Sequence, residues 1–134
     1  MASIAFLEPY EHATVSPIPG DRRAELVWAL IMSGLKKIEQ AHQAFEGGRP
    51  VEAGFYIGRA TSIVDALRDA LDLQAGGQKA RDMDNIYEHI DTCLQIAVGD
   101  AAPEVLLKAR EAVCRLSALW QAGQCDDALG SGTA

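Results

Sequence analysis

The strongest constraint on this chain is a run of apolar side chains at helical spacing between residues 57 and 71. These positions recur at alternating steps of three and four, and they are Ile57, Ala60, Val64, Leu67 and Leu71. That spacing lines one face of an α-helix. We expect Gly76 and Gly77 to stop the helix, because glycine readily takes the left-handed conformation of a helix C-cap. The pattern resumes over 83–94, so the sequence predicts an antiparallel helical hairpin.

Three more segments extend this pattern to a four-helix architecture. The first helix is predicted over 21–46, because Asp21 is a good N-cap residue and Gly47-Gly48 closes the segment. Prolines at positions 50 and 103 suit the first turn of a helix, so the second helix is expected over 50–75 and the fourth over 103–122. The third is expected from about 79 to 98. Four helices with short links predict an all-α, antiparallel up-down four-helix bundle.

The two ends of the chain differ from this bundle, which we expect over 21–122. Residues 1–20 hold three prolines and cannot form one continuous helix, yet they carry several large apolar side chains. We expect an irregular N-terminal segment that either packs permanently on the bundle or acts as a movable flap over a binding groove. Residues 123–134 are rich in glycine and polar side chains, which predicts a disordered tail.

Composition and charge exclude several classes of function. The net charge of -7 argues against a nucleic-acid partner, which would require a basic face. No apolar run is long enough to span a bilayer, and the N-terminus lacks the features of a signal peptide. The three cysteines are scattered without a CxxC pair, which is typical of reduced thiols. We therefore expect a cytoplasmic protein without membrane insertion.

The sequence offers little support for catalysis or metal binding. A di-metal bundle site needs two Glu-x-x-His pairs, and only Glu39 with His42 matches that spacing. Cys93 and His89 lie four residues apart, but no catalytic motif surrounds them. There is no phosphate-binding glycine loop. We expect neither an enzyme nor a cofactor, which leaves binding through apolar surface as the most economical interpretation.

Large side chains and a run of acids are the remaining candidates for binding. The large side chains exceed what one core stripe requires, and they are Trp28, Phe55, Tyr56, Tyr87 and Trp120. Core packing is the simpler role for each one alone. The acids on the third helix are Asp82, Asp84, Glu88 and Asp91. They are most simply a solvated helix face, and the alternative is an electrostatic attraction for a basic partner segment.

The segment IGRATSIVDALRDALDLQAGGQKARDMDNIYEHI, which contains the hairpin, resembles the FliS family of flagellar secretion chaperones. The resemblance extends from Tyr10 to about Trp120, and its matching positions keep the family order and spacing. They are Ile57, Ala60, Ile63, Val64, Leu67, Leu71, Asp72, Gly77, Met83, Ile86, Tyr87 and Ile90. The chain departs from the family pattern on the first helix, where 31–33 reads Ile-Met-Ser instead of a Tyr-Asp-Gly type of triplet.

The resemblance implies a four-helix export chaperone. Members of this family bind the disordered C-terminal region of flagellin, prevent its premature polymerisation and aid its delivery to the flagellar type III export apparatus. An export-apparatus protein or a co-chaperone is a further candidate partner. The alternative function is a helical adaptor or regulatory protein that binds another flagellar or secretion component. Such partners fit helix-in-groove recognition, in which an amphipathic helix lies in an apolar groove.

We expect two groups of residues to carry this function. The predicted cargo-binding residues are Leu26, Leu30, Tyr56, Ile63, Tyr87 and Trp120. The predicted anchors of the N-terminal flap are Tyr10 and Val15, which keep the spacing that the family shows there.

Overall fold

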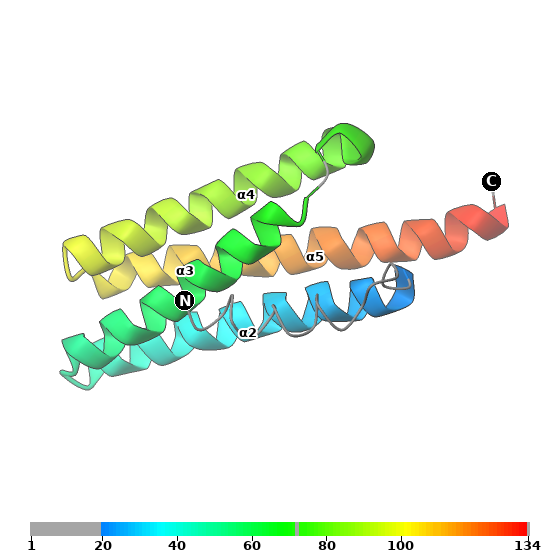
Figure 1. Cartoon of the computed structure of the whole chain (residues 1–134). Helices are drawn as coiled ribbons and strands as arrows, with labels where there is room; N and C mark the ends of the chain where they lie inside the picture. Colours follow the sequence, from blue (N-terminus) through cyan, green and yellow to red (C-terminus); the bar gives the residue numbers. More distant parts are fainter. Residues whose placement is uncertain (1–19, 72, 134) are drawn as a thin grey trace, which may run out of the picture.

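Four α-helices form the described part of the protein. The computed structural model describes the backbone of residues 20–71 and 73–133, and the side chains of residues 22–71 and 76–122. The helices are α2 (Gly20–Glu46), α3 (Pro50–Asp69), α4 (Leu73–Gly99) and α5 (Pro103–Thr133). Figure 1 shows them packed lengthwise, with no strand among the described residues. The predicted all-α four-helix bundle is therefore confirmed.

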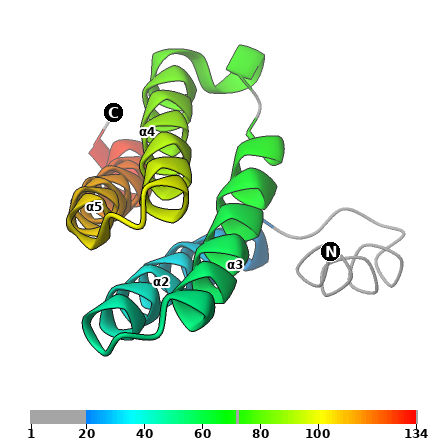
Figure 2. The same ribbon diagram turned by 90° about the vertical axis from the view of Figure 1, so that its left-hand side faces the viewer.

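Each helix runs antiparallel to the next, which gives the up-down-up-down order (Figure 1). α2 packs against α3 and α5, and α4 packs against the same two helices. The diagonal pairs are therefore α2 with α4 and α3 with α5. Figure 2 shows α3 beside α2 at one side of the bundle and α4 beside α5 at the other.

The core is built from the stripes that the sequence predicted. Ile57, Ala60, Val64 and Leu67 are all buried, together with Ile31, Ile38, Ile90, Leu94, Leu106 and Leu116 from the other helices. Alanines are frequent among the buried side chains, and small side chains let helices approach one another closely. No polar or charged residue is fully buried among the described residues. The bundle is therefore held together mainly by apolar burial.

The end of α2 and the start of α3 follow the sequence prediction, whereas α2 begins at Gly20, one residue before the predicted N-cap Asp21. Gly48 takes a positive φ of 74° after the last turn of α2, and the backbone N–H of Arg49 donates to the Ala44 carbonyl. Pro50 then opens α3, where its missing N–H removes no helical hydrogen bond. The predicted glycine stop and proline start are confirmed here.

The predicted end of α3 near residue 75 is wrong, because α3 ends at Asp69. The backbone N–H of Leu71 donates to the Arg68 carbonyl as the chain turns, and Leu71 still packs against the core. The apolar spacing thus continues through a turn, so it overstated the length of the helix. Gly76 and Gly77 do not end α3, and the predicted start of the third helix near residue 79 is wrong, because α4 begins at Leu73. Gly77 has φ 59° and ψ -138° and interrupts α4 near its start.

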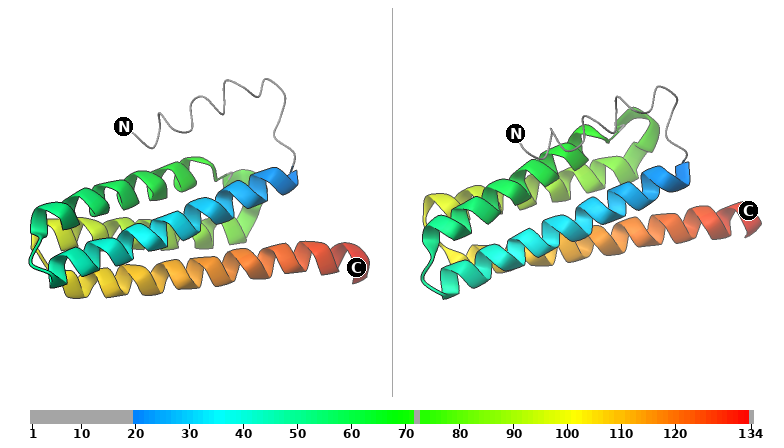
Figure 3. Two further views of the ribbon diagram at one scale, coloured as in Figure 1. Left: turned by 90° about the horizontal axis from the view of Figure 1, so that it is seen from below. Right: turned by 60° about the horizontal axis from the view of Figure 1, so that its bottom comes forward.

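α5 continues to Thr133, so its predicted end near residue 122 is also wrong. Glycine lowers helix propensity by about 1 kcal/mol relative to alanine, and that cost does not by itself end a helix. Figure 3 shows the last turns of α5 extending past the beginning of α2. Residues 1–19, with the predicted anchors Tyr10 and Val15, lie outside the described residues. The division into flap, bundle and tail stays a prediction.

Over the described residues, none of the helices combines the length and the apolar character needed to cross a bilayer.

Candidate partner-binding surface

Two of the predicted cargo residues, Tyr56 and Ile63 on α3, lie beside residues of α2. Two more, Leu26 and Leu30, lie on α2 itself. The stripe of Leu26 and Leu30 continues at helical spacing through Gly34 to Lys37. A Cβ atom at Gly34 would lie 3.5 Å from Ile63 Cγ2, and Lys37 Nζ lies 5.7 Å from the centroid of the Tyr56 ring. We call this strip of facing residues, from Leu26 to Lys37 on α2 and from Tyr56 to Ile63 on α3, the α2–α3 seam.

Among the described residues, α3 does not cover the part of the α2–α3 seam where α2 begins, and we call this part the open end of the seam. Gly34 lies opposite Ile63, and α3 continues only about 9 Å past Ile63 at a rise of about 1.5 Å per residue. Leu26 lies about 12 Å from Gly34 along α2 by the same rise, beyond the end of α3. Leu26 and Leu30 are half-buried, whereas Ile63 lies in the core. An incoming apolar side chain would therefore meet the leucines of α2 first.

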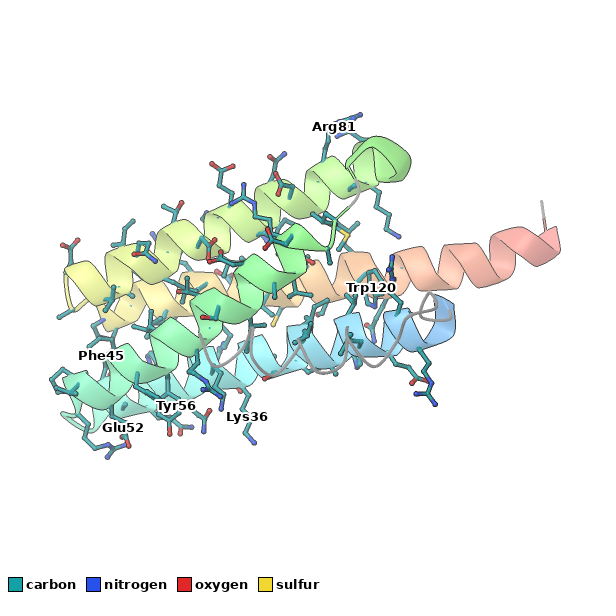
Figure 4. The ribbon with its side chains drawn as sticks, in the orientation of Figure 1. Lys36, Phe45, Glu52, Tyr56, Arg81 and Trp120 are labelled. Carbon is teal, nitrogen blue, oxygen red and sulfur yellow. The ribbon has the colours of Figure 1, made fainter. Side chains whose placement is uncertain are left out.

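The other two predicted residues lie on the other two helices, α4 and α5. Tyr87 is 1% exposed in the core side of α4, and its burial raises the pKa of its hydroxyl, with a smaller contribution from Asp84. Trp120 on α5 is half-buried against the core, and Figure 4 shows it toward the end of the bundle where α2 begins. Tyr87 is therefore a core residue that stabilises the packing of the bundle. The assignment of all six residues to cargo binding stays a prediction.

The most exposed large apolar side chains are ones that the predicted cargo set left out. Val51 is 87% exposed and Phe55 is 60% exposed, and both lie on the first turns of α3. The Phe55 and Tyr56 rings meet edge to face, with centroids 5.6 Å apart and an interplanar angle of 71°. The sequence itself indicated this exposed apolar pair, because Val51 and Phe55 are four residues apart and both lie off the buried stripe of α3.

Beside the shared apolar core, charged side chains of α3 and α4 meet at a partly exposed α3–α4 seam. Arg68 Nε on α3 donates to Asp84 Oδ1 on α4 over 2.7 Å, and Arg68 Nη2 lies 3.7 Å from Glu88 Oε2. The acids of α4 therefore do not form one solvated face. Glu88 is exposed, as the sequence predicted, but Asp84 is half-buried against α3.

Asp91 is the second half-buried acid at this α3–α4 seam. Its Oδ1 atom is buried and has no hydrogen-bond partner among the described residues. Burial raises the pKa of Asp91 to about 7, and the Asp65 carboxyl group on α3 raises it further. The protonated form of Asp91 is therefore favoured at this position.

The described residues give catalysis and metal binding no support. They contain no group of three or more metal-ligating His, Cys, Asp or Glu side chains. His89 Nε2 lies 3.8 Å from Cys93 Sγ, but burial raises the pKa of the Cys93 thiol, which disfavours the nucleophilic thiolate. Glu39 and His42 line a cavity of about 180 Å³ between α2 and α5, together with Arg110. The second Glu-x-x-His pair that a di-metal site requires is missing from the sequence.

Comparison with known proteins adds independent information about the family. A family model described as "Flagellar protein FliS" matches residues 7–125. The flagellar secretion chaperone FliSB of Pseudomonas aeruginosa is 31% identical over 91 residues, which cover 67% of this chain and 72% of that protein. The flagellar secretion chaperone FliS of Vibrio cholerae is 23% identical over 115 residues, 85% of each chain. With this match and the four-helix fold, the chain belongs to the FliS family of flagellar secretion chaperones.

Proposed function

We propose that this chaperone binds the C-terminal region of flagellin, and that the α2–α3 seam is a principal part of the binding surface. The observation that supports this proposal is that Tyr56 and Ile63 of α3 lie beside Lys37 and Gly34 of α2, which continue the helical stripe of Leu26 and Leu30. The names of the two relatives support a role in flagellar secretion. The choice of flagellin as cargo rests on the resemblance in the sequence.

The recognition mode that fits this surface is an amphipathic helix laid against helices. Leu26 and Leu30 are one turn apart, so a partner helix with apolar residues at steps of three and four can pack against them. Such burial contributes about 25 cal/mol per Å² of apolar surface removed from water. A segment that is disordered when free loses conformational entropy as it orders, which offsets part of this gain and keeps the complex reversible.

Escort follows from this binding without a chemical reaction. While the apolar face of the flagellin segment is covered, it is unavailable for contact with other flagellin subunits, so premature polymerisation is prevented. We place this step in the cytoplasm, before delivery to the flagellar type III export apparatus. The proposal requires no cofactor, because only non-covalent contacts form and break.

Calorimetry with a peptide from the C-terminal region of the host's own flagellin tests the proposal directly. Binding at micromolar affinity or tighter, with a negative heat-capacity change, is the expected result for apolar burial coupled to folding. Leu26→Ser should weaken this binding at least about tenfold, since it removes an apolar contact at the open end of the seam. Leu107→Ser is the matched control, because Leu107 is an exposed leucine on α5.

Two results would contradict the proposal. The first is an absence of binding by a chain that circular dichroism shows to be folded and helical. The second is equal weakening by Leu26→Ser and Leu107→Ser, which would remove the α2–α3 seam from the binding surface. The first result would favour the adaptor function, in which the bundle binds a different flagellar or secretion component.

A further inference from the structure

A second surface lies on the outer side of α3, and it shares Tyr56 and Lys37 with the end of the α2–α3 seam that lies away from Leu26. Val51 and Phe55 point away from the bundle, because their neighbours Ala53, Ile57 and Ala60 on the same helix are buried. A Cβ atom at Gly58 would meet no described atom within 4 Å, so no described side chain covers the helix surface beside Phe55. We call Val51, Phe55, Tyr56 and Arg59 of α3, with Lys37 of α2, the α3 outer patch.

The α3 outer patch is a continuous row of cations and aromatic rings. Lys37 Nζ lies 5.7 Å from the centroid of the Tyr56 ring, and Tyr56 meets Phe55 edge to face. Arg59 Cζ lies 5.7 Å from the Phe55 centroid at the other end of the row. Cations at this distance from an aromatic ring are attracted by the negative charge of its face. The row therefore presents positive charge and apolar ring surface together.

Positive charge in this patch is not balanced by carboxylates in the described part of the chain. Lys37 and Arg59 form no ion pair with a described Asp or Glu. Glu52, the acid nearest to Val51 in the sequence, is already paired with Arg49 through the Arg49 Nε atom. Lys36 is exposed on α2, and Figure 4 shows it on the same side of the bundle as Tyr56.

The rest of the molecule has the opposite charge. The full chain carries a net charge of -7, and α4 holds a cluster of acids that faces α3 from the other side. An acidic chain that keeps a basic and apolar patch on one helix pair is complementary to an acidic partner.

We propose that the α3 outer patch docks an acidic amphipathic helix of a second protein, distinct from the flagellin segment. Val51 and Arg59 are about 12 Å apart along α3, which is about two helical turns. The complement of this patch is a helix with two apolar residues one turn apart that contact Val51 and Phe55. Carboxylates beside those residues would pair with Arg59 and Lys37, which sets the orientation of the helix and excludes basic partners.

The test uses the full chain and two synthetic helical peptides that share one pattern of leucines. One peptide carries glutamates beside the leucines, and its copy carries lysines at the same positions. The glutamate peptide should bind at least about tenfold tighter than the lysine copy, and its affinity should fall as salt screens the charges. Amide shifts in an NMR titration should be centred on Val51–Arg59.

Variants of the patch then separate charge from apolar contact. Arg59→Glu combined with Lys37→Glu should weaken the glutamate peptide at least about tenfold and strengthen the lysine copy. Phe55→Ser should weaken both peptides, because the apolar contact is common to them. Arg115→Glu and Leu107→Ser are the controls, since both residues are exposed on α5. Circular dichroism should show that each variant keeps its helix content.

Three results would overturn the proposal. They are equal affinity for the two peptides, no binding of either peptide, and amide shifts centred outside Val51–Arg59. A flagellin peptide that competes with the glutamate peptide and loses affinity in Arg59→Glu would assign the patch to cargo binding instead. Because the two-peptide comparison does not involve flagellin, failure of the flagellin proposal leaves this test intact.

Discussion

Arg68 and Asp84 form the closest ion pair between α3 and α4, with Arg68 Nε 2.7 Å from Asp84 Oδ1. A second guanidinium nitrogen, Arg68 Nη2, lies 3.5 Å from Asp84 Oδ2. The hydrogen bond to Asp84 is the largest cause of the raised pKa of Arg68. Both side chains are partly exposed, so water screens this pair and limits its contribution to stability.

Arg68→Ala should lower the free energy of unfolding by about 1 kcal/mol, because it leaves the half-buried Asp84 without its charged partner. Urea denaturation followed by circular dichroism measures this change. Arg59→Ala is the control, since Arg59 pairs with no described carboxylate, and surface changes of that kind stay within about 0.5 kcal/mol. Equal stability of the two variants would show that the ion pair does not hold α3 to α4.

Asp91 should make the stability of the bundle depend on pH. Its folded-state pKa is raised to about 7 from 3.8, so the fold favours the protonated carboxyl. The contribution of the protonated Asp91 carboxyl to the stability of the fold is complete below the unfolded-state pKa of Asp91, and it is lost as pH rises through about 7. The groups that face Asp91 are Asp65, which raises its pKa, and Arg68, which lowers it. We therefore expect the protein to be less stable at pH 8.5 than at pH 5.5.

Asp91→Asn removes this titration and should reduce the loss of stability between those pH values by at least about 1 kcal/mol. Thermal or urea denaturation at both pH values provides the measurement. Glu111→Gln, at an exposed position on α5, should leave the pH dependence of the wild type in place. An unchanged pH dependence in Asp91→Asn would mean that Asp91 is ionised in the folded protein at neutral pH.

Two glycines should respond to alanine in opposite directions. Gly58 lies inside α3 with nothing within 4 Å of a built Cβ atom, so Gly58→Ala should stabilise the protein by about 0.5–1 kcal/mol. Gly77 has φ 59° and ψ -138°, which L-amino acids rarely adopt. Gly77→Ala should therefore destabilise the protein by more than about 1 kcal/mol. Urea denaturation of both variants decides this, and a loss of stability in Gly58→Ala would contradict the open surface described beside it.

Deletion of residues 1–18 should raise the affinity for the flagellin peptide. This prediction comes from the sequence, where apolar side chains precede Asp21 in a segment that cannot be one helix. If the segment covers the binding surface when cargo is absent, its removal abolishes that competition and the apparent affinity increases. Calorimetry on the full and shortened chains tests it, with Tyr10→Ala and Val15→Ala as smaller perturbations of the same contact. Unchanged or lower affinity after the deletion would argue against a flap.

The sequence by itself determined the helical content, the register of the buried stripes and several helix ends. Gly48 and Pro50 act through their own backbone geometry, and the spacing of Ile57 and Ala60 marks a buried face wherever the helix packs. Such signals are local, because they depend on residues within one or two turns. The family was likewise readable from the order and spacing of these positions.

Only the tertiary structure decided where α3 stops and which polar residues meet. Leu71 continues the apolar spacing of α3 but packs on the core from a turn, so local periodicity could not locate the end at Asp69. The pairing of Arg68 with Asp84 depends on which faces of α3 and α4 come together. The exposure of Phe55 depends on no other helix covering that side of α3. These features arise from contacts between distant segments, and no single helix carries the information that sets them.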